Sequence, residues 1–142
     1  MGVDHINAKK AYFDTNVFIY LFEEHPQYQT SVIQIIERLE SIDCQIITSE
    51  LTLAECLIKP CADNDIFSQE RYIEALQTSD FLTVVPVSKD VLIEASHLRA
   101  SYRNKLPDAI HLATALTQGC DLFVGNDKGI TTPEGLELFL LF

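Results

Sequence analysis

The sequence has no low-complexity tract, no internal repeat and no apolar run long enough to cross a lipid bilayer. Residues 1–10 also lack the apolar segment of a secretory signal peptide. The 142 residues are 47% hydrophobic, so the chain is long enough to bury a core of its own. We therefore expect one cytoplasmic domain spanning residues 1–142, with no membrane association.

Closely paired cysteines are absent as well, because none of the four cysteines belongs to a CxxC motif. Cys56 and Cys61 are five residues apart, but no second ligand pair with zinc-type spacing accompanies them. Isolated cysteines of intracellular proteins usually serve as small core residues. We expect that role, with redox or metal binding as the alternative, for Cys44, Cys56, Cys61 and Cys120.

Positive charge is scarce, since ten Lys and Arg residues face twenty-one Asp and Glu residues, for a net charge of −11. A phosphate backbone is bound mainly through Lys and Arg, so this balance argues against broad, non-specific binding of nucleic acid. Acidity can serve solubility alone. It also suits a protein that uses cations at its site or binds a cationic partner.

Short apolar stretches alternate with segments of helical periodicity. In residues 27–41, for example, Val32, Ile35 and Leu39 recur on one helical face. The expected strands are 11–13, 44–48, 81–87 and 121–125, with 136–142 as a last strand at a sheet edge or a subunit contact. The expected helices are a short one before residue 23, then 27–41, 50–57 ending before Pro60, 66–77, 89–103, and one from Pro107 to Gly119. This alternation indicates a three-layer α/β fold with a mostly parallel sheet.

Three polar residues, Asp14, Thr15 and Asn16, interrupt the first apolar stretch. They stand between a strand and a helix, at the carboxyl end of the strand, where ligands bind in open α/β sheets. Three further acids come at comparable places. Asp127 follows the fourth strand, Asp108 opens the helix before it, and Glu55 lies on the helix after the second strand.

Each acid alone has an ordinary explanation. Asp14 can cap the following helix, Glu55 can lie on a solvated face, Asp108 can meet a helix dipole and Asp127 can sit in a turn. Together, four converging carboxylates would repel one another. A hard divalent cation such as Mg²⁺ or Mn²⁺ resolves that conflict because it prefers oxygen ligands. Such a site suits metal-assisted hydrolysis of phosphodiesters.

Four segments carry a family resemblance: Phe13-Asp-Thr-Asn16, Thr52-Leu-Ala-Glu55, the block from Leu106 to Ala115, and Gly125-Asn-Asp127. In this order and spacing they resemble the PIN-domain ribonucleases, above all the small VapC-type toxins of prokaryotic toxin–antitoxin pairs. The resemblance implies a single PIN-like α/β/α domain and an RNA substrate. It also implies Mg²⁺ or Mn²⁺ dependence, a homodimer and a small antitoxin as partner. The catalytic, metal-binding acids would be Asp14, Glu55, Asp108 and Asp127.

One departure from the family pattern is Gly125, where many relatives carry a Ser or Thr hydroxyl. Asn126 is the candidate polar substitute, and Asn16 is expected to support Asp14 or a water on the metal. His111 lies one turn after Asp108, on the same helical face. We favour a structural, hydrogen-bonding role for His111 over that of a catalytic base.

The tight basic cluster of the chain contains Arg99, Arg103 and Lys105, with Tyr102 among them, and leads directly into Asp108. Positive charge and stacking often occur together at single-stranded nucleic-acid sites, so this cluster is a candidate RNA contact. A solvated helix face paired with nearby acids is the alternative.

Three other functions are kept as alternatives to a toxin. The first is a PIN nuclease that acts in RNA maturation, and the second is a catalytically inactive PIN-like binding module. The third is a phosphoaspartate protein with Asp14 phosphorylated. Phosphatases of that kind need a second acid two residues after the first, and the residue there is Asn16.

Overall fold

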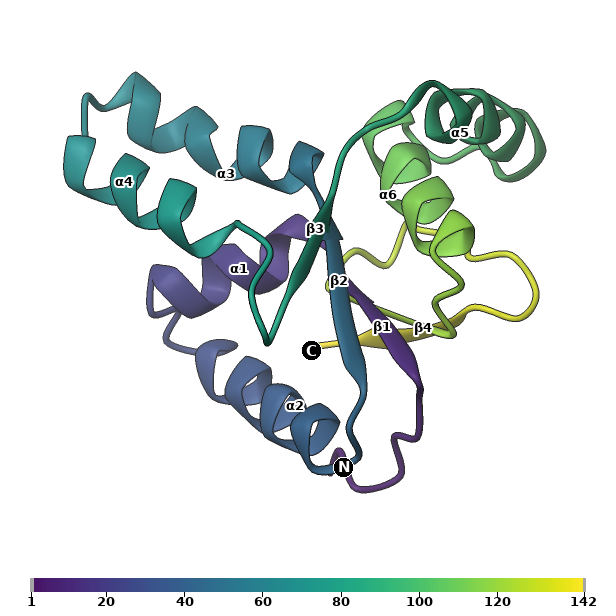
Figure 1. The fold of residues 1–142 in the computed structure, drawn as a ribbon, viewed down its shortest axis with the longest axis horizontal. Helices are drawn as coiled ribbons and strands as arrows, with labels where there is room; N and C mark the ends of the chain where they lie inside the picture. Colours follow the sequence, from purple (N-terminus) through teal and green to yellow (C-terminus); the bar gives the residue numbers. More distant parts are fainter. Residues whose placement is uncertain (1, 142) are drawn as a thin grey trace.

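The computed structural model describes residues 2–141, which form five strands and six helices (Figure 1). In chain order they are β1 (Lys10–Phe13), α1 (Thr15–Phe22), α2 (Gln29–Ser41), β2 (Gln45–Ser49), α3 (Glu50–Ala62), α4 (Ile66–Ala75), β3 (Thr83–Val85), α5 (Lys89–Tyr102), α6 (Leu106–Thr117), β4 (Leu122–Gly125) and β5 (Glu137–Leu140). Among these residues, no helix is long and apolar enough to span a membrane.

All pairings within the five-stranded sheet are parallel, in the order β3-β2-β1-β4-β5. The central strand, β1, pairs with β2 through Lys10 and Gln45, and with β4 through Ala11 and Leu122. The chain moves outward from β1 to β3 on one side and then returns to add β4 and β5 on the other. The carboxyl end of β1 is therefore at the point where the strand order reverses, which is the usual ligand position in such sheets.

Alternate residues of the strands face two separate cores. Ala11 and Phe13 of β1 pack into a cluster with side chains of α1 to α4, whereas Tyr12 packs into a second cluster with α5 and α6. Successive side chains of a strand point to opposite faces, so a stretch as short as β1 contributes to both cores. Helices on both faces confirm the expected three-layer α/β fold (Figure 1).

The expected end of the third helix was wrong. Helix α3 continues through Pro60 to Ala62. Proline removes one N–H bond from a helix, but Pro60 lies in the last turn and its side chain is buried. The Pro60 carbonyl accepts hydrogen bonds from Asp65 N at 2.9 Å and Gln69 Nε2 at 3.1 Å, which join α3 to α4.

Smaller differences concern strand ends and one cysteine. β3 covers only Thr83–Val85 and ends directly before Pro86, as a residue without an N–H requires. Leu106, and not Pro107, is the first residue of α6. Cys44, Cys56 and Cys120 are buried as expected, but Cys61 is exposed, so the expectation of a core role for that residue was wrong.

Candidate active site

Asp14 occupies the junction between β1 and α1. Its backbone N–H donates to Val124 O at 2.9 Å, which extends the pairing of β1 with β4 by one residue. Its Oδ1 accepts from Thr15 N at 2.8 Å and thereby caps α1. The residue is only 5% exposed. Asp14 is thus a helix cap and a buried acid at the same time.

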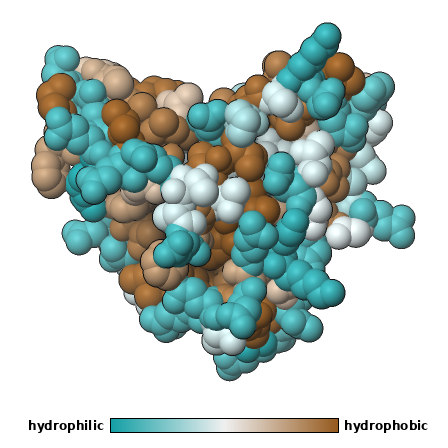
Figure 2. Space-filling view, viewed as in Figure 1, coloured by the Kyte–Doolittle hydropathy of each residue, from teal (hydrophilic) through white to brown (hydrophobic). Residues whose placement is uncertain are grey.

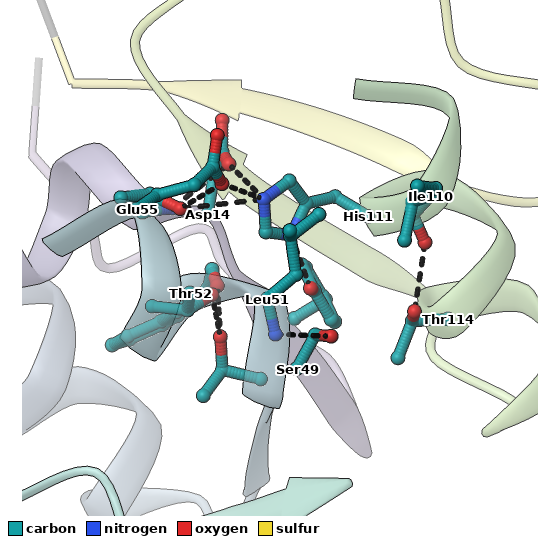
Figure 3. Close-up of polar contacts among 12 residues, drawn as sticks. Asp14, Ser49, Leu51, Thr52, Glu55, Ile110, His111 and Thr114 are labelled. Atoms are coloured by element: carbon teal, nitrogen blue, oxygen red, sulfur yellow. Dashed lines mark hydrogen bonds and ion pairs between the residues drawn. The ribbon is translucent and has the colours of Figure 1, made fainter. Parts of the chain in front are cut away.

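His111 joins Asp14 to Glu55 (Figure 3). Its Nε2 lies 2.5 Å from Glu55 Oε1 and 3.6 Å from Asp14 Oδ1. The hydroxyl of Thr15 donates to the same Glu55 oxygen at 2.7 Å. On the opposite side of the ring, Nδ1 lies 2.5 Å from the hydroxyl of Tyr12. Residues from β1, α1, α3 and α6 therefore meet in one hydrogen-bonded group.

The charges of this group follow from its contacts. Burial raises the pKa of Glu55, but the hydrogen bonds from His111 and Thr15 outweigh it and bring the pKa below its usual value. Burial lowers the pKa of His111, yet the hydrogen bond to Glu55 and the charge of Asp14 raise the pKa above its usual value. Glu55 is therefore an ionised acceptor of hydrogen bonds.

The remaining two acids belong to the same electrostatic environment. Burial, and then the charges of Asp14 and Asp127, raise the pKa of Asp108 to about 6. Burial also raises the pKa of Asp14, against the opposing effect of His111, and the charges of Glu55 and Asp127 add to it. Asp127 Oδ1 accepts from Gly129 N at 2.8 Å, so this acid also orders its own turn. The four carboxylates therefore interact electrostatically at one edge of the sheet.

Carboxylate oxygens that repel one another are chemically suited to a hard dication such as Mg²⁺ or Mn²⁺. Within residues 2–141 as they are placed, no group of three or more His, Cys, Asp or Glu side chains is arranged to hold a metal ion. Asn126 contributes a further oxygen beside Asp127. Its Nδ2 donates to Tyr20 Oη at 3.1 Å, while its Oδ1 is the one buried side-chain polar atom of the described residues without a hydrogen-bond partner. The donor chemistry fits a divalent cation.

The supporting residues expected from the sequence lie close to the acids. Asn16 is in the first turn of α1, two residues after Asp14. A Cβ atom at Gly125 would lie 3.4 Å from Asp14 Oδ2. The departure from the family pattern at this position therefore directly affects the surroundings of Asp14.

The candidate RNA contacts lie in the last turn of α5 and in the segment that joins it to α6. Arg99 Nη1 donates to Asn104 O at 2.7 Å, so this guanidinium also holds the turn. Arg103 ends α5 in the left-handed conformation, and Lys105 directly precedes α6. Both are exposed. The cluster lies next in sequence to Asp108.

Two residues of the hydrogen-bonded group were missed in the sequence, Tyr12 and the hydroxyl of Thr15. Strand alternation was the available signal for Tyr12, because it places this residue on the face opposite Phe13, toward α6. Thr15 follows Asp14 directly, but a threonine near the start of a helix is common in sites without function, so its position in the sequence gave no signal.

Comparison with known proteins identifies the family to which this sequence is similar. The PIN domain family model matches residues 11–134. Ribonuclease VapC1 of Aquifex aeolicus (strain VF5) is 24% identical over 134 residues, which are 91% of this chain and 89% of that protein. A toxin–antitoxin complex from Klebsiella pneumoniae contains a chain with 27% identity and a TM-score of 0.67, covering 89% of this chain and 94% of the other.

A third similarity concerns the fold alone. The crystal structure of VapBC2 from Rickettsia felis, bound to a DNA fragment from their promoter, matches with a TM-score of 0.72 at 17% identity. The match covers 92% of this chain and 98% of the other. Since the family model spans most of the sequence and the sheet, helices and acids are arranged as described, the chain belongs to the PIN domain family.

Proposed function

We propose that this protein is a divalent-metal-dependent endoribonuclease that hydrolyses phosphodiester bonds of RNA and acts as the toxin of a toxin–antitoxin pair. The observation that carries the proposal is the group of four acids at the carboxyl edge of the sheet, where Asp14 and Asp108 have raised pKa values. Uncompensated negative charge of this kind requires a cation before all four can be ionised.

Similar proteins support the same activity. The curated relative from Aquifex aeolicus is named a ribonuclease, and the similar Klebsiella pneumoniae chain comes from a toxin–antitoxin complex. Both matches cover about nine tenths of this chain. The proposal therefore concerns the chain as a whole and not one of its motifs.

We assign Asp14, Glu55, Asp108 and Asp127 as the acids that hold Mg²⁺ or Mn²⁺, with Asn16 and Asn126 as polar support. A bound dication would supply positive charge for activating water and for stabilising the leaving oxygen of the phosphodiester. The protein's own contribution is to hold the acids in place. Asp14 is fixed by its cap to α1, and Glu55 by Thr15 and His111. We further assign Arg99, Arg103 and Lys105 to the RNA backbone.

A protein partner would cover apolar surface that the fold leaves exposed. Figure 2 shows apolar side chains on the arm formed by α3 and α4, and a surface that is hollowed between this arm and α5–α6. The exposed aliphatic and phenylalanine side chains on α3, α4 and α5 are Ile58, Ile66, Phe67, Ile73, Leu92 and Ile93. A net charge of −11 favours a basic antitoxin. We propose such an antitoxin, a homodimer and a cytoplasmic location.

The activity is tested with purified protein and RNA. The wild type is expected to cleave RNA in Mn²⁺ or Mg²⁺ and to lose this activity in EDTA. Asp14→Asn keeps the helix cap, because Asn caps as well as Asp, but removes the charge, so cleavage should fall below detection in a folded protein. Asp80→Asn, at an exposed acid between α4 and β3, is the matched control and should cleave normally.

Two outcomes would separate the alternatives. Absence of metal-dependent cleavage by the wild type would favour an inactive binding module. Cleavage without growth arrest on expression, and without a short neighbouring reading frame whose product relieves such arrest, would favour RNA maturation. Mapping of new RNA 5′ ends after induced expression identifies the substrate in either case.

A further inference from the structure

His111 is buried to 1% exposure in the middle of the acid group, and the function proposed above uses it only as a hydrogen-bond partner of Glu55. Both of its ring nitrogens are engaged. Nε2 contacts Glu55 Oε1, and Nδ1 contacts the Tyr12 hydroxyl. A general base needs a free nitrogen lone pair within reach of the proton that it removes. The contacts of His111 leave no such nitrogen, so they argue against that role.

The hydrogen atoms of the group can be assigned from its chemistry. A carboxylate only accepts hydrogen bonds, so the contact between Glu55 Oε1 and His111 Nε2 requires a hydrogen on that nitrogen. Thr15 uses its single hydroxyl hydrogen toward Glu55, and its oxygen can then accept from His111 Nε2 at 3.3 Å. Two donors therefore converge on Glu55.

Both donors reach the same carboxylate oxygen. Thr15 and His111 each bind Glu55 Oε1, and neither binds Oε2. These two bonds restrict the position of Oε1 and leave Oε2 without a bond to either donor. His111 Nε2 also lies 3.6 Å from Asp14 Oδ1, so one ring lies between an acid at the β1–α1 junction and an acid of α3 (Figure 3).

Tyr12 connects this arrangement to the rigid centre of the fold. It belongs to β1, the central strand, is fully buried, and stacks on Phe123 of β4 with ring centroids 5.3 Å apart. Its hydroxyl fixes the His111 ring from the side opposite Glu55. Glu55 is thus connected to the central strand of the sheet by hydrogen bonds through His111 and Tyr12.

We propose that His111 is a positioning residue that, braced by Tyr12, orients Glu55 as a ligand of the divalent cation without contacting the substrate. The inference rests on the proposed function for the cation. Partners that orient metal ligands in proteins typically change metal affinity about 10- to 100-fold when they are removed. The first measurement is therefore the affinity for Mn²⁺ alone, by calorimetry, without RNA.

Three variants separate positioning from general structural support. His111→Leu removes both contacts and should weaken Mn²⁺ binding roughly tenfold or more. His111→Gln places an amide N–H near the position of Nε2 and should restore most of the affinity. Tyr12→Phe removes one hydroxyl while keeping the ring, and should give a loss between those of the other two variants. Circular dichroism establishes that each variant is folded.

A double-mutant cycle tests whether His111 acts through Glu55. In a Glu55→Ala background, His111→Leu should have almost no further effect on Mn²⁺ affinity, because the ligand it orients is gone. An equal loss in both backgrounds would overturn the proposal, as would unchanged Mn²⁺ binding in folded His111→Leu. If His111→Leu does not fold, unchanged Mn²⁺ binding in Tyr12→Phe would overturn the proposal instead.

A second measurement needs no metal. Nitrogen-15 NMR of the histidine ring should show a hydrogen on Nε2 of His111 in the wild type and a changed ring signal in Glu55→Gln. A ring without hydrogen on Nε2 would overturn the proposal. Failure of the proposed nuclease function would give a different result. The wild type would then bind Mn²⁺, with the coupling between His111 and Glu55 described above, but would cleave no RNA.

Discussion

Asp14 shows that a structural role and a proposed functional role can belong to one side chain. From its sequence position it could be read as a helix cap or as an acid of the site. Its Oδ1 caps α1, and the same carboxylate lies 3.6 Å from His111 and raises the pKa of Asp108. A cap at the start of α1 fixes the carboxylate at the sheet edge, so the first role prepares the second.

Gly125 offers a prediction about stability at the residue scale. Its backbone is not in the left-handed region, and a Cβ would meet Asp14 Cβ and Phe123 Cε1 at ordinary contact distances. Gly125→Ala should therefore raise the free energy of unfolding by about 0.4–1 kcal/mol, because alanine reduces the freedom of the unfolded chain. Urea denaturation measures the change. Gly119→Ala, at φ 73°, is the control and should destabilise; a destabilised Gly125→Ala would contradict the prediction.

The arginines at the α5–α6 turn give a prediction about RNA binding. Arg103 is exposed, whereas the guanidinium of Arg99 also donates to Asn104 O. Replacing both with Ala should weaken RNA affinity and reduce the salt dependence of binding, because contacts to phosphate release counterions. Lys89→Ala, at the other end of α5, is the matched control. Unchanged RNA cleavage and salt slope in the double variant would remove the assignment.

At the scale of elements, the starts of the helices are governed by their capping residues. Ser49 accepts from Leu51 N and Ser88 accepts from Val91 N, so these two serines cap α3 and α5. Asp65 caps α4 through bonds from Ser68 N at 3.1 Å and Ser68 Oγ at 2.6 Å. Such caps satisfy N–H groups that have no partner within the helix.

The Asp65 cap should make the stability of α4 depend on pH. The side-chain and backbone hydrogen bonds of Ser68 lower the pKa of Asp65 below its ordinary 3.8. A lowered pKa in the folded state means that the contribution is present above 3.8 and is lost as pH falls through the folded value. Asp65→Ala should therefore destabilise at neutral pH, and the difference from wild type should shrink in acid.

Ser88→Ala is the control for this prediction, since its hydroxyl does not titrate in that range. It should cost about 1 kcal/mol in the free energy of unfolding, independent of pH. Denaturation curves of the two variants and the wild type across the acidic range compare the two caps. A constant difference for Asp65→Ala would show that the carboxylate charge is not what stabilises the helix start.

At the scale of the whole molecule, negative charge is both global and concentrated at the sheet edge. The net charge is −11, and at the candidate site burial and the neighbouring acids raise the pKa values of Asp14 and Asp108. A cation that binds the folded site and not the unfolded chain stabilises the fold by mass action. Saturating Mn²⁺ should therefore raise the melting temperature by several degrees.

Two comparisons make this effect specific to the site. Sodium chloride at the same ionic strength screens the global repulsion and should give a smaller rise. Asp14→Asn combined with Asp108→Asn should lose the additional effect of Mn²⁺ but keep that of sodium chloride. Differential scanning fluorimetry provides the melting temperatures. An equal rise in the double variant would place the Mn²⁺ effect outside the four acids.

The sequence alone determined the fold class, the positions of most elements and the membership in the PIN family. The fold class and the elements follow from local signals, such as helical spacing in 27–41 and polar residues directly after apolar strands. The family follows instead from the resemblance of four segments, which the family model over residues 11–134 confirms. It also pointed to the acids as a set, since parallel strands bring their carboxyl ends to one edge. Their catalytic roles remain a prediction.

Only the tertiary structure decided how the acids are held. Tyr12 and His111 are 99 positions apart, and Thr15 and Glu55 are 40 apart, so their contacts depend on which face of β1 meets α6 and how α3 leaves β2. The passage of α3 through Pro60 was likewise decided by bonds from residues of the next helix and its cap. Local patterns specify where an element starts, whereas the contacts between distant side chains are specified by the packing of the whole chain.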